Sequence, residues 1–221
     1  MSGELEMAAS GPLPGGEGRA AFPARPWLTI FTRPRATMRA IIASDPERHV
    51  VLIACLSGVL SAIDRASDRT LGDQIAWPWI LLAAAILGSI FGYLWLLIYG
   101  GLVRWTGEWL GGAASSEDVR AAIAWPNVAL VPAALFYVAE ITFFGDELFT
   151  SDEPSIGFVW LSLVHMGVGV PMAIWWVVLL AKCVGEVQQF SAWKGLGNLV
   201  IALLMAISPF ITIALAVHLA T

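Results

Sequence analysis

Charged side chains are scarce in this sequence: they make up 13% of its 221 residues, whereas soluble domains carry about 25%. Hydrophobic residues make up 58% of the chain. So few charges exclude an ordinary soluble domain, because its surface would lack the groups that water solvates. The composition therefore predicts a membrane protein.

The residue patterns of common enzymes and cofactor sites are also lacking. The two cysteines, Cys55 and Cys183, fall in or beside apolar segments and provide neither a disulfide framework nor a thiolate metal site. A haem held by His165 and His218 is disfavoured, because their predicted depths in the membrane differ by roughly 9 Å. No nucleophile has an adjacent base. We predict a protein that is not an enzyme and that holds no metal or cofactor.

Five apolar stretches are long enough to cross a bilayer, which needs about 20 residues of helix. They predict an all-α, polytopic membrane protein with a membrane domain over 27–221. The first stretch is short, so Arg48 and Arg65 are expected to reach the headgroups and complete the crossing. The first 26 residues have acids, prolines and no apolar core, and we predict a disordered cytoplasmic tail. The predicted spans are about 50–62, 77–103, 119–144, 156–183 and 198–218.

Positive charge predicts the orientation, because Lys and Arg stay on the cytoplasmic side. One side carries six arginines before the first span and four later positive residues: Arg104, Arg120, Lys182 and Lys194. The other side has only Arg65 and Arg69. We therefore expect a cytoplasmic N-terminus and a C-terminus on the opposite side of the membrane. Tryptophans mark the same boundaries, at Trp77, Trp79 and Trp160 outside and at Trp105, Trp109, Trp125 and Trp193 inside.

The segment before the first span predicts an amphipathic helix over 34–44 that lies at the membrane interface. Trp27, Ile30 and Phe31 would sink to the acyl boundary. Arginines on the other flank would contact lipid headgroups or a partner: Arg33, Arg35 and Arg39. The alternative is an ordinary cytoplasmic helix packed on the protein.

The connection between the second and third spans contains a glycine pair that resembles a phosphate loop. It has no lysine, and the acids Glu117 and Asp118 would repel an anion. We predict instead a cytoplasmic turn between two helices, in which Gly111 and Gly112 adopt positive φ angles. Ser115 and Asp118 then form a capping box for the third span.

Four segments together resemble the prokaryotic branch of the Yip (Ypt/Rab-interacting protein) family. They are P-R-x-T-x-R-x-I-I-x-x-D-P at 34–46, L-G-G-x-x-S-x-x-D at 110–118, A-W-P-N-V at 124–128 and G-E-V-Q-Q-F-S-A-W-K at 185–194. The likeness runs from about Trp27 to the C-terminus and implies a five-span helical membrane domain. The prokaryotic branch further implies a bacterial inner-membrane protein, with its C-terminus in the periplasm. Eukaryotic members are associated with vesicle traffic and small GTPases. The D-L-x-G-P motif of those members has no counterpart before Trp27, so no GTPase partner is carried over.

Ionisable residues inside spans are costly and therefore candidate functional residues. Glu140 and His165 fall at similar predicted depth and could form a proton-relaying pair, and with Asn127 they make a possible polar pathway. The alternatives are an interface carboxylate and a histidine bonded to a backbone carbonyl. Prolines interrupt the later spans, and small-residue ridges (Ala54, Gly58 and Ala62; Ala84, Gly88 and Gly92) predict closely packed helices or an assembly surface.

Two functions fit these features. The first is a non-enzymatic membrane protein that organises lipids or membrane partners, with a membrane protein or a second copy as partner and no role for nucleic acid. The second is a transporter of small solutes or ions that uses Glu140, His165 and the proline-broken helices.

Overall fold

The computed structural model describes residues 21–220, and every element in that range is helical. The predicted tail therefore lies outside the described residues as far as residue 20. The first and last parts of the chain form α1 (Pro26–Thr32), α2 (Pro34–Ser44), α3 (Val50–Asp68), η1 (Leu71–Asp73), α8 (Ile156–Val187) and α9 (Ala192–Ala220). Between them lie α4 (Trp77–Ala83), η2 (Ala84–Gly88), α5 (Ser89–Trp109), α6 (Ser116–Ala124), η3 (Trp125–Leu130), α7 (Val131–Phe144) and η4 (Gly145–Leu148).

Five helical segments are long and apolar enough to cross a membrane, as the sequence predicts: Val50–Asp68, Trp77–Trp109, Ser116–Leu148, Ile156–Val187 and Ala192–Thr212. The first segment does not end near residue 62. It has 19 residues, about 28 Å of helix, and its last turns continue because Ile63 and Ala66 are buried in an apolar cluster with Ile80 and Phe149. At the end of the bundle away from the last turns of α3, helices α5 and α8 continue past their apolar stretches, to Trp109 and Val187. Helix α9 begins at Ala192, before its apolar stretch. These extensions carry polar residues.

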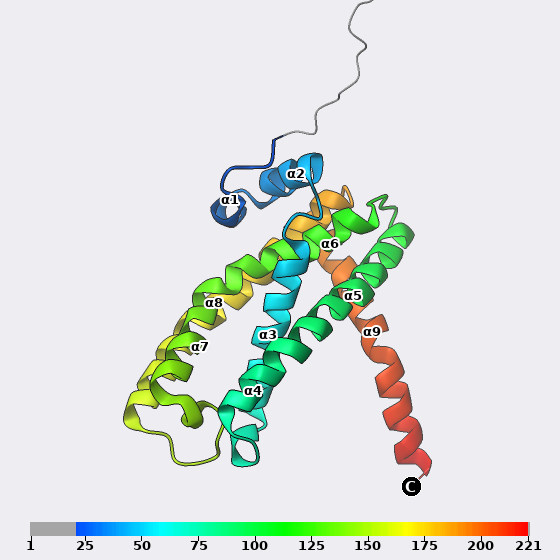
Figure 1. Cartoon of the computed structure of the whole chain (residues 1–221). Helices are drawn as coiled ribbons and strands as arrows, with labels where there is room; N and C mark the ends of the chain where they lie inside the picture. The colour runs from blue at the N-terminus through cyan, green and yellow to red at the C-terminus, as the bar shows by residue number, and fades with distance from the viewer. Residues whose placement is uncertain (1–20, 221) are drawn as a thin grey trace, which may run out of the picture.

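Different elements lie at the two ends of the bundle (Figure 1). At one end, here called the α2 end, α1 and α2 lie across the ends of the spans, beside α6. At the other end, here called the loop end, lie the turn between α3 and α4, the loop between α7 and α8, and the last turn of α9. The loop end is tied together by the Gly72 N–H, which donates to Phe149 O at 2.7 Å, and by the Ser67 hydroxyl, which donates to Leu148 O at 2.7 Å.

Helix α3 packs directly against the second span through glycines. A Cβ added to Gly58 would overlap the backbone of Gly88 and Gly92, and one added to Gly92 would overlap Ala54. The small-residue ridges predicted from the sequence therefore face each other within one chain. The second span contains a π-helical segment at this contact, η2, which widens the helix locally.

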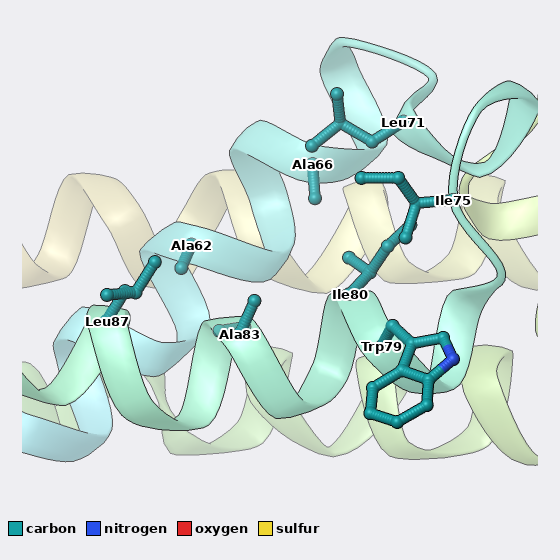
Figure 2. Close-up of a pocket in the computed structure, with 9 residues that line it drawn as sticks. Ala62, Ala66, Leu71, Ile75, Trp79, Ile80, Ala83 and Leu87 are labelled. Carbon is teal, nitrogen blue, oxygen red and sulfur yellow. The ribbon is translucent and has the colours of Figure 1, made fainter.

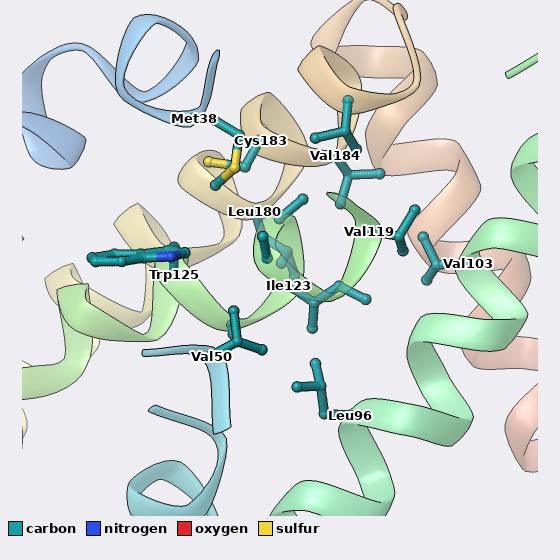
Figure 3. Packing of buried hydrophobic residues seen from close by; sticks show 14 of the residues in the cluster. Met38, Val50, Leu96, Val103, Val119, Ile123, Trp125, Leu180, Cys183 and Val184 are labelled. Atoms are coloured by element: carbon teal, nitrogen blue, oxygen red, sulfur yellow. The ribbon is translucent and has the colours of Figure 1, made fainter. Parts of the chain in front are cut away.

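A buried apolar cluster fills the α2 end, where Met38 of α2, Val119 of α6 and Cys183 of α8 come from three different helices (Figure 3). Met38, Val119 and Cys183 have no exposed surface. Phe22 packs against this cluster and against the ring of His49, at 6.0 Å between centroids. Phe22 belongs to the last part of the predicted tail, and its ring is therefore in contact with the folded part of the protein.

Trp125 is covered by protein and not exposed as a tryptophan that anchors the membrane boundary would be. It is fully buried, because Trp27 and Phe22 cover its ring at centroid distances of 4.7 and 6.1 Å. Its Nε1 has no hydrogen-bond partner among the described residues. Other boundary tryptophans are exposed, including Trp79 and Trp193.

Candidate functional site

Helix α2 is held on the α2 end by one carboxylate of α8. Arg39 Nε donates to Glu186 Oε1 at 2.8 Å, and Arg35 Nη1 lies 3.5 Å from Glu186 Oε2. Arg35 also donates from Nη2 to the Phe190 carbonyl at 3.0 Å. Glu186 is only 8% exposed. The two guanidinium groups compensate the charge of this nearly buried carboxylate. These contacts fix the position of α2 on the protein.

The turn that follows α8 explains why the Phe190 carbonyl is available. Gln189 has a left-handed backbone with φ of 59°, and the Phe190 N–H donates to the Gly185 carbonyl at 2.6 Å. This arrangement ends a helix and turns the chain sharply. The segment G-E-V-Q-Q-F therefore supplies both the carboxylate and the carbonyl that Arg35 contacts.

Some of the residues predicted to contact the membrane are buried by protein, and others are exposed on α1 and α2. Ile30 is completely buried by protein, which corrects the expectation that it contacts acyl chains, because the apolar face of α1 and α2 covers the core cluster. Trp27 is 39% exposed and Leu28 is 63% exposed. Arg33 is exposed, and the Arg39 side chain is 71% exposed although it binds Glu186. The outer surface of α1 and α2 thus combines apolar and basic side chains.

The turn between α5 and α6 follows the prediction in part. The Ser115 hydroxyl accepts from the Asp118 N–H at 3.1 Å and caps α6. Gly111 has φ of 85°. Gly112 does not have a positive φ, which corrects the prediction. It is close to a side chain instead, because a Cβ at Gly112 would overlap Gln188.

Gln188 joins this turn to α5. It is 1% exposed, its Nε2 donates to the Val103 carbonyl, and its Oε1 accepts from the Ala114 N–H, each at 3.4 Å. A Cβ at Gly107 would also overlap Gln188. The amide is therefore enclosed by two glycines and the backbone of the turn.

A second buried amide lies beside the first. Asn198, on α9, has no exposed surface. It donates from Nδ2 to the Val103 carbonyl at 3.0 Å and accepts from the Thr106 hydroxyl at 2.6 Å. Tyr99 adds a hydrogen bond to the Leu199 carbonyl at 2.9 Å. These bonds satisfy buried polar groups and fix α9 to α5 at the α2 end.

Glu140 and His165 are brought together between α7 and α8. His165 Nδ1 lies 3.1 Å from Glu140 Oε1 and 3.2 Å from Oε2. The Ser162 hydroxyl is 3.4 Å from Oε1. Glu140 is 2% exposed and the His165 side chain is 17% exposed. The histidine pairs with the carboxylate rather than with a backbone carbonyl.

Aromatic rings surround this pair and link it to the loop end. Phe136 stacks on His165 at 5.4 Å between centroids, and Tyr137 meets the same ring edge-on at 4.7 Å. The Tyr137 hydroxyl donates to Asp64 Oδ1 on α3 at 2.6 Å. Asp64 is exposed. A line of polar groups thus leads from the surface near the loop end towards Glu140.

Asn127 does not join this pair. Its Nδ2 donates to the Ala124 carbonyl at 3.0 Å, and its Oδ1 accepts from Trp176 Nε1 at 3.0 Å. Asn127 and Glu140 are 13 positions apart along η3 and α7, roughly 20 Å of helix. Its place in a polar pathway stays a prediction.

Sequence reasoning missed the residues that organise the α2 end: Glu186, Gln188 and Asn198. The available signal was their chemistry, since two amides and a carboxylate at the ends of apolar stretches need partners. Within the described residues, no group of three or more His, Cys, Asp or Glu side chains could hold a metal ion.

The four segments that suggested a family are therefore neighbours in space, and most of them meet at the α2 end. The family model for the Yip1 domain matches residues 28–215. No curated protein and no solved structure gives a significant match. With the match covering most of the sequence and including all five apolar helices, the chain belongs to the Yip1 domain family.

Proposed function

We propose that this protein is a non-enzymatic integral membrane protein that organises lipids or membrane partners, with the α2 end in the cytoplasm as its contact face. One observation carries the proposal: Glu186 holds α2 in place while the outer surface of α1 and α2 exposes Trp27, Leu28 and Arg33. Exposed aromatic and aliphatic side chains next to arginine are typical of segments that lie at an anionic membrane surface. The distribution of positive charge supports the cytoplasmic assignment.

The experiment measures whether Leu28 contacts lipid. A spin label is attached at Leu28→Cys in the full chain, with Cys55 and Cys183 replaced by serine, and the protein is placed in nanodiscs that contain anionic lipid. We expect the label to collide more often with oxygen, which concentrates in acyl chains, than with a water-soluble nickel reagent. The reverse preference would contradict lipid contact.

A charge reversal tests the basic component. Arg33→Glu should shift the Leu28 label towards water in anionic nanodiscs and have little effect in nanodiscs of neutral lipid. Arg69→Glu at the loop end is the matched control and should leave the label unchanged. An equal effect of both substitutions would indicate that the shift is not local to α1 and α2.

A second function, transport of protons or small ions, is favoured by the contact between Glu140 and His165. Paired ionisable groups inside a membrane domain are typical of ion and proton pathways. Glu140→Gln should abolish substrate-dependent flux in proteoliposomes, if flux is present in the unmodified protein. The absence of proton flux in the unmodified protein would leave the organising role as the supported function.

A further inference from the structure

Glu140 is a buried acid whose charge can be compensated only by the histidine beside it. Among the described residues its carboxylate has polar contacts with His165 and with the Ser162 hydroxyl, and it forms no ion pair with lysine or arginine. An ionised carboxylate this deeply buried is costly unless a positive charge compensates it. The pair is therefore most stable when it holds one proton and has no net charge.

This proton has two possible positions within the pair. Either His165 is an imidazolium beside the Glu140 carboxylate, or Glu140 is protonated and donates to a neutral imidazole. Both forms keep the observed contact of 3.1 Å between Nδ1 and Oε1. In each form a proton from water makes one new N–H or O–H bond, and its release leaves an uncompensated carboxylate between α7 and α8.

Tyr137 connects the pair to the exposed surface of α3. Its ring meets the His165 ring edge-on, and its hydroxyl donates to Asp64. Asp64 and Asp68, both exposed on α3, and the buried Glu140 all act electrostatically on this hydroxyl. The hydroxyl is therefore within reach of both the buried acid and the exposed ones, which exchange protons with water. This contact is an entrance for protons from the loop end.

The other charged side chains near the loop end do not compensate the pair. Glu147 of η4 accepts from the Ser155 N–H at 2.8 Å. Asp146 of η4 and Arg65 and Arg69 of α3 are exposed. In the part of the chain that the structure describes, none of them forms an ion pair with either member of the pair. The pair is therefore kept neutral by its own proton and not by a neighbouring cation.

An apolar groove between α3 and α4 opens near the same end but does not lead to the pair (Figure 2). Every residue that lines it is hydrophobic. Ala62 and Ala66 line it from α3, whereas Asp64 is two positions from each of them, roughly 200° around the helix. The acid that bonds to Tyr137 is therefore on the other side of α3 from this groove.

Towards the α2 end, α7 and α8 offer no comparable route. Positions 128–136 on α7 and 166–181 on α8 contain no ionisable side chain, and the longer of these stretches covers roughly 24 Å of helix. Asn127 lies beyond the first stretch, and its amide already bonds to the Ala124 carbonyl and to Trp176. A proton that moved in this direction would have to cross apolar helix contacts.

We propose that Glu140 and His165 form a binding site for one proton, which exchanges with the compartment at the loop end through Tyr137 and is closed towards the α2 end. The pair thereby responds to the pH of one compartment. The inference does not rest on the role proposed for the α2 end. It differs from transport, because a site with one entrance binds and releases its proton on the same side of the membrane.

The first experiment measures whether the pair holds a proton. Full-length protein in nanodiscs is studied at about pH 7.5, where an ordinary histidine is neutral and an ordinary carboxyl group is ionised. NMR of nitrogen-labelled histidine reports the charge of His165, and infrared spectroscopy reports protonation of Glu140. Signals are assigned by their loss in His165→Gln and Glu140→Gln. We expect one of the two groups to be protonated, and a neutral imidazole beside an ionised carboxylate would overturn the proposal.

The second experiment measures from which side the proton is exchanged. Vesicles that contain the protein are sorted by an affinity tag that follows α9, whose last turn lies at the loop end (Figure 1). The loop end then faces the bath in one population and the lumen in the other. The bath is made alkaline while the lumen stays buffered at neutral pH. We expect the protonated signal to fall only where the loop end faces the bath, and a response in the other population or in neither would contradict the proposal.

A conservative variant tests the entrance. Tyr137→Phe keeps the ring and removes the hydroxyl, so the response to the alkaline bath should become several times slower. Tyr93→Phe, at an exposed position on α5, is the matched control and should leave the rate unchanged. An unchanged rate in Tyr137→Phe would contradict entry through its hydroxyl.

Proton flux separates this inference from transport. Proteoliposomes that contain the unmodified protein should show no flux that depends on Glu140 under an imposed pH gradient. Flux that Glu140→Gln abolishes would overturn the closure towards the α2 end and support transport. The Leu28 label reports on the α2 end alone, so failure of the organising role and failure of this inference are distinguishable.

Discussion

The side chain of Gln188 occupies the space beside Gly112 in which a Cβ would otherwise lie. The two residues come from different parts of the chain, one after the end of α8 and the other in the turn after α5. Their contact encloses an amide that bonds to the Val103 carbonyl and the Ala114 N–H. A glycine here is therefore required by space and not by backbone angle.

Gly112→Ala should destabilise the protein by about 1 to 3 kcal/mol, the usual effect of adding a group to a filled site. Thermal unfolding in detergent measures the change. Gly197→Ala is the matched control: nothing lies within 4 Å of a Cβ at that helical position, so this change should be neutral or stabilising. In a Gln188→Ala background the cost of Gly112→Ala should fall. A cost that is independent of Gln188 would contradict the packing argument.

Glu186→Gln should loosen α2 from the bundle, because the amide cannot neutralise two guanidinium groups. Cys183 reports the change, since it is fully buried in the cluster that includes Met38 of α2. In a Cys55→Ser background we expect maleimide to label Cys183 about tenfold faster, which corresponds to a modest loss for a partly exposed ion pair.

The control for this labelling is Glu108→Gln, which removes the partner of Arg104 in an exposed pair at 3.1 Å. It should leave the labelling of Cys183 unchanged. Equal labelling rates for Glu186→Gln and the unmodified protein would mean that apolar packing alone holds α2.

Glu140 and His165 should be energetically coupled. A double-mutant cycle with Glu140→Ala and His165→Ala, measured by reversible unfolding in mixed micelles, should give a coupling of about 0.6 to 1.7 kcal/mol, as found for hydrogen bonds within membranes. Asn127→Ala combined with Glu140→Ala is the control and should be additive, because Asn127 bonds to Trp176 instead. Additivity of the first pair would show that the observed contact contributes nothing to stability.

The loop end should respond to acid through Asp73. The hydrogen bond from the Ser151 N–H lowers the pKa of Asp73 below its ordinary value of 3.8. Because the pKa of Asp73 is lower in the folded than in the unfolded protein, its ionised carboxylate stabilises the fold at pH values above the unfolded-state pKa. This stabilisation is lost as the pH falls through the folded-state pKa. The Ser151 amide should therefore be protected from hydrogen exchange near pH 5. Below about pH 3.8 its exchange rate, divided by the intrinsic rate at the same pH, should rise.

Asp73→Asn should remove this acid response and leave exchange at Ser151 faster at every pH. Asp152→Asn, in the same loop, is the charge-matched control and should retain the response. A persistent acid response in Asp73→Asn would assign it to another carboxylate.

The sequence predicted the features that depend on local physics. Five long apolar stretches predicted five spans, because such stretches are stable in lipid. Serine is favoured at helix N-termini, and Ser115 therefore predicted the cap of α6. The small residues at Gly58 and Gly92 indicated close helix packing. In each case the cause lies within a few residues or follows from the membrane itself.

Features that join distant parts of the chain were not predictable in the same way. Arg35 and Arg39 suggested contact with headgroups because their partner, Glu186, lies far away in the sequence. Trp125 suggested a membrane boundary because nothing local shows that Trp27 covers it. The contact between Glu140 and His165 was predicted because the two residues lie at similar depth in their spans. Side chains inside a membrane can meet only at the same depth, so depth leaves few possible partners.

The π-helical segment η2 has a consequence for engineering the second span. One extra residue in a single turn rotates all later side chains about the helix axis, by roughly 100° relative to an uninterrupted α-helix. A helical wheel drawn with one phase from Trp77 to Trp109 would therefore assign the wrong surface to residues on one side of Ala84–Gly88. Deleting one residue within that segment should return the helix to regular winding but turn Gly92 away from Gly58, so sequence length at this point is as constrained as residue identity.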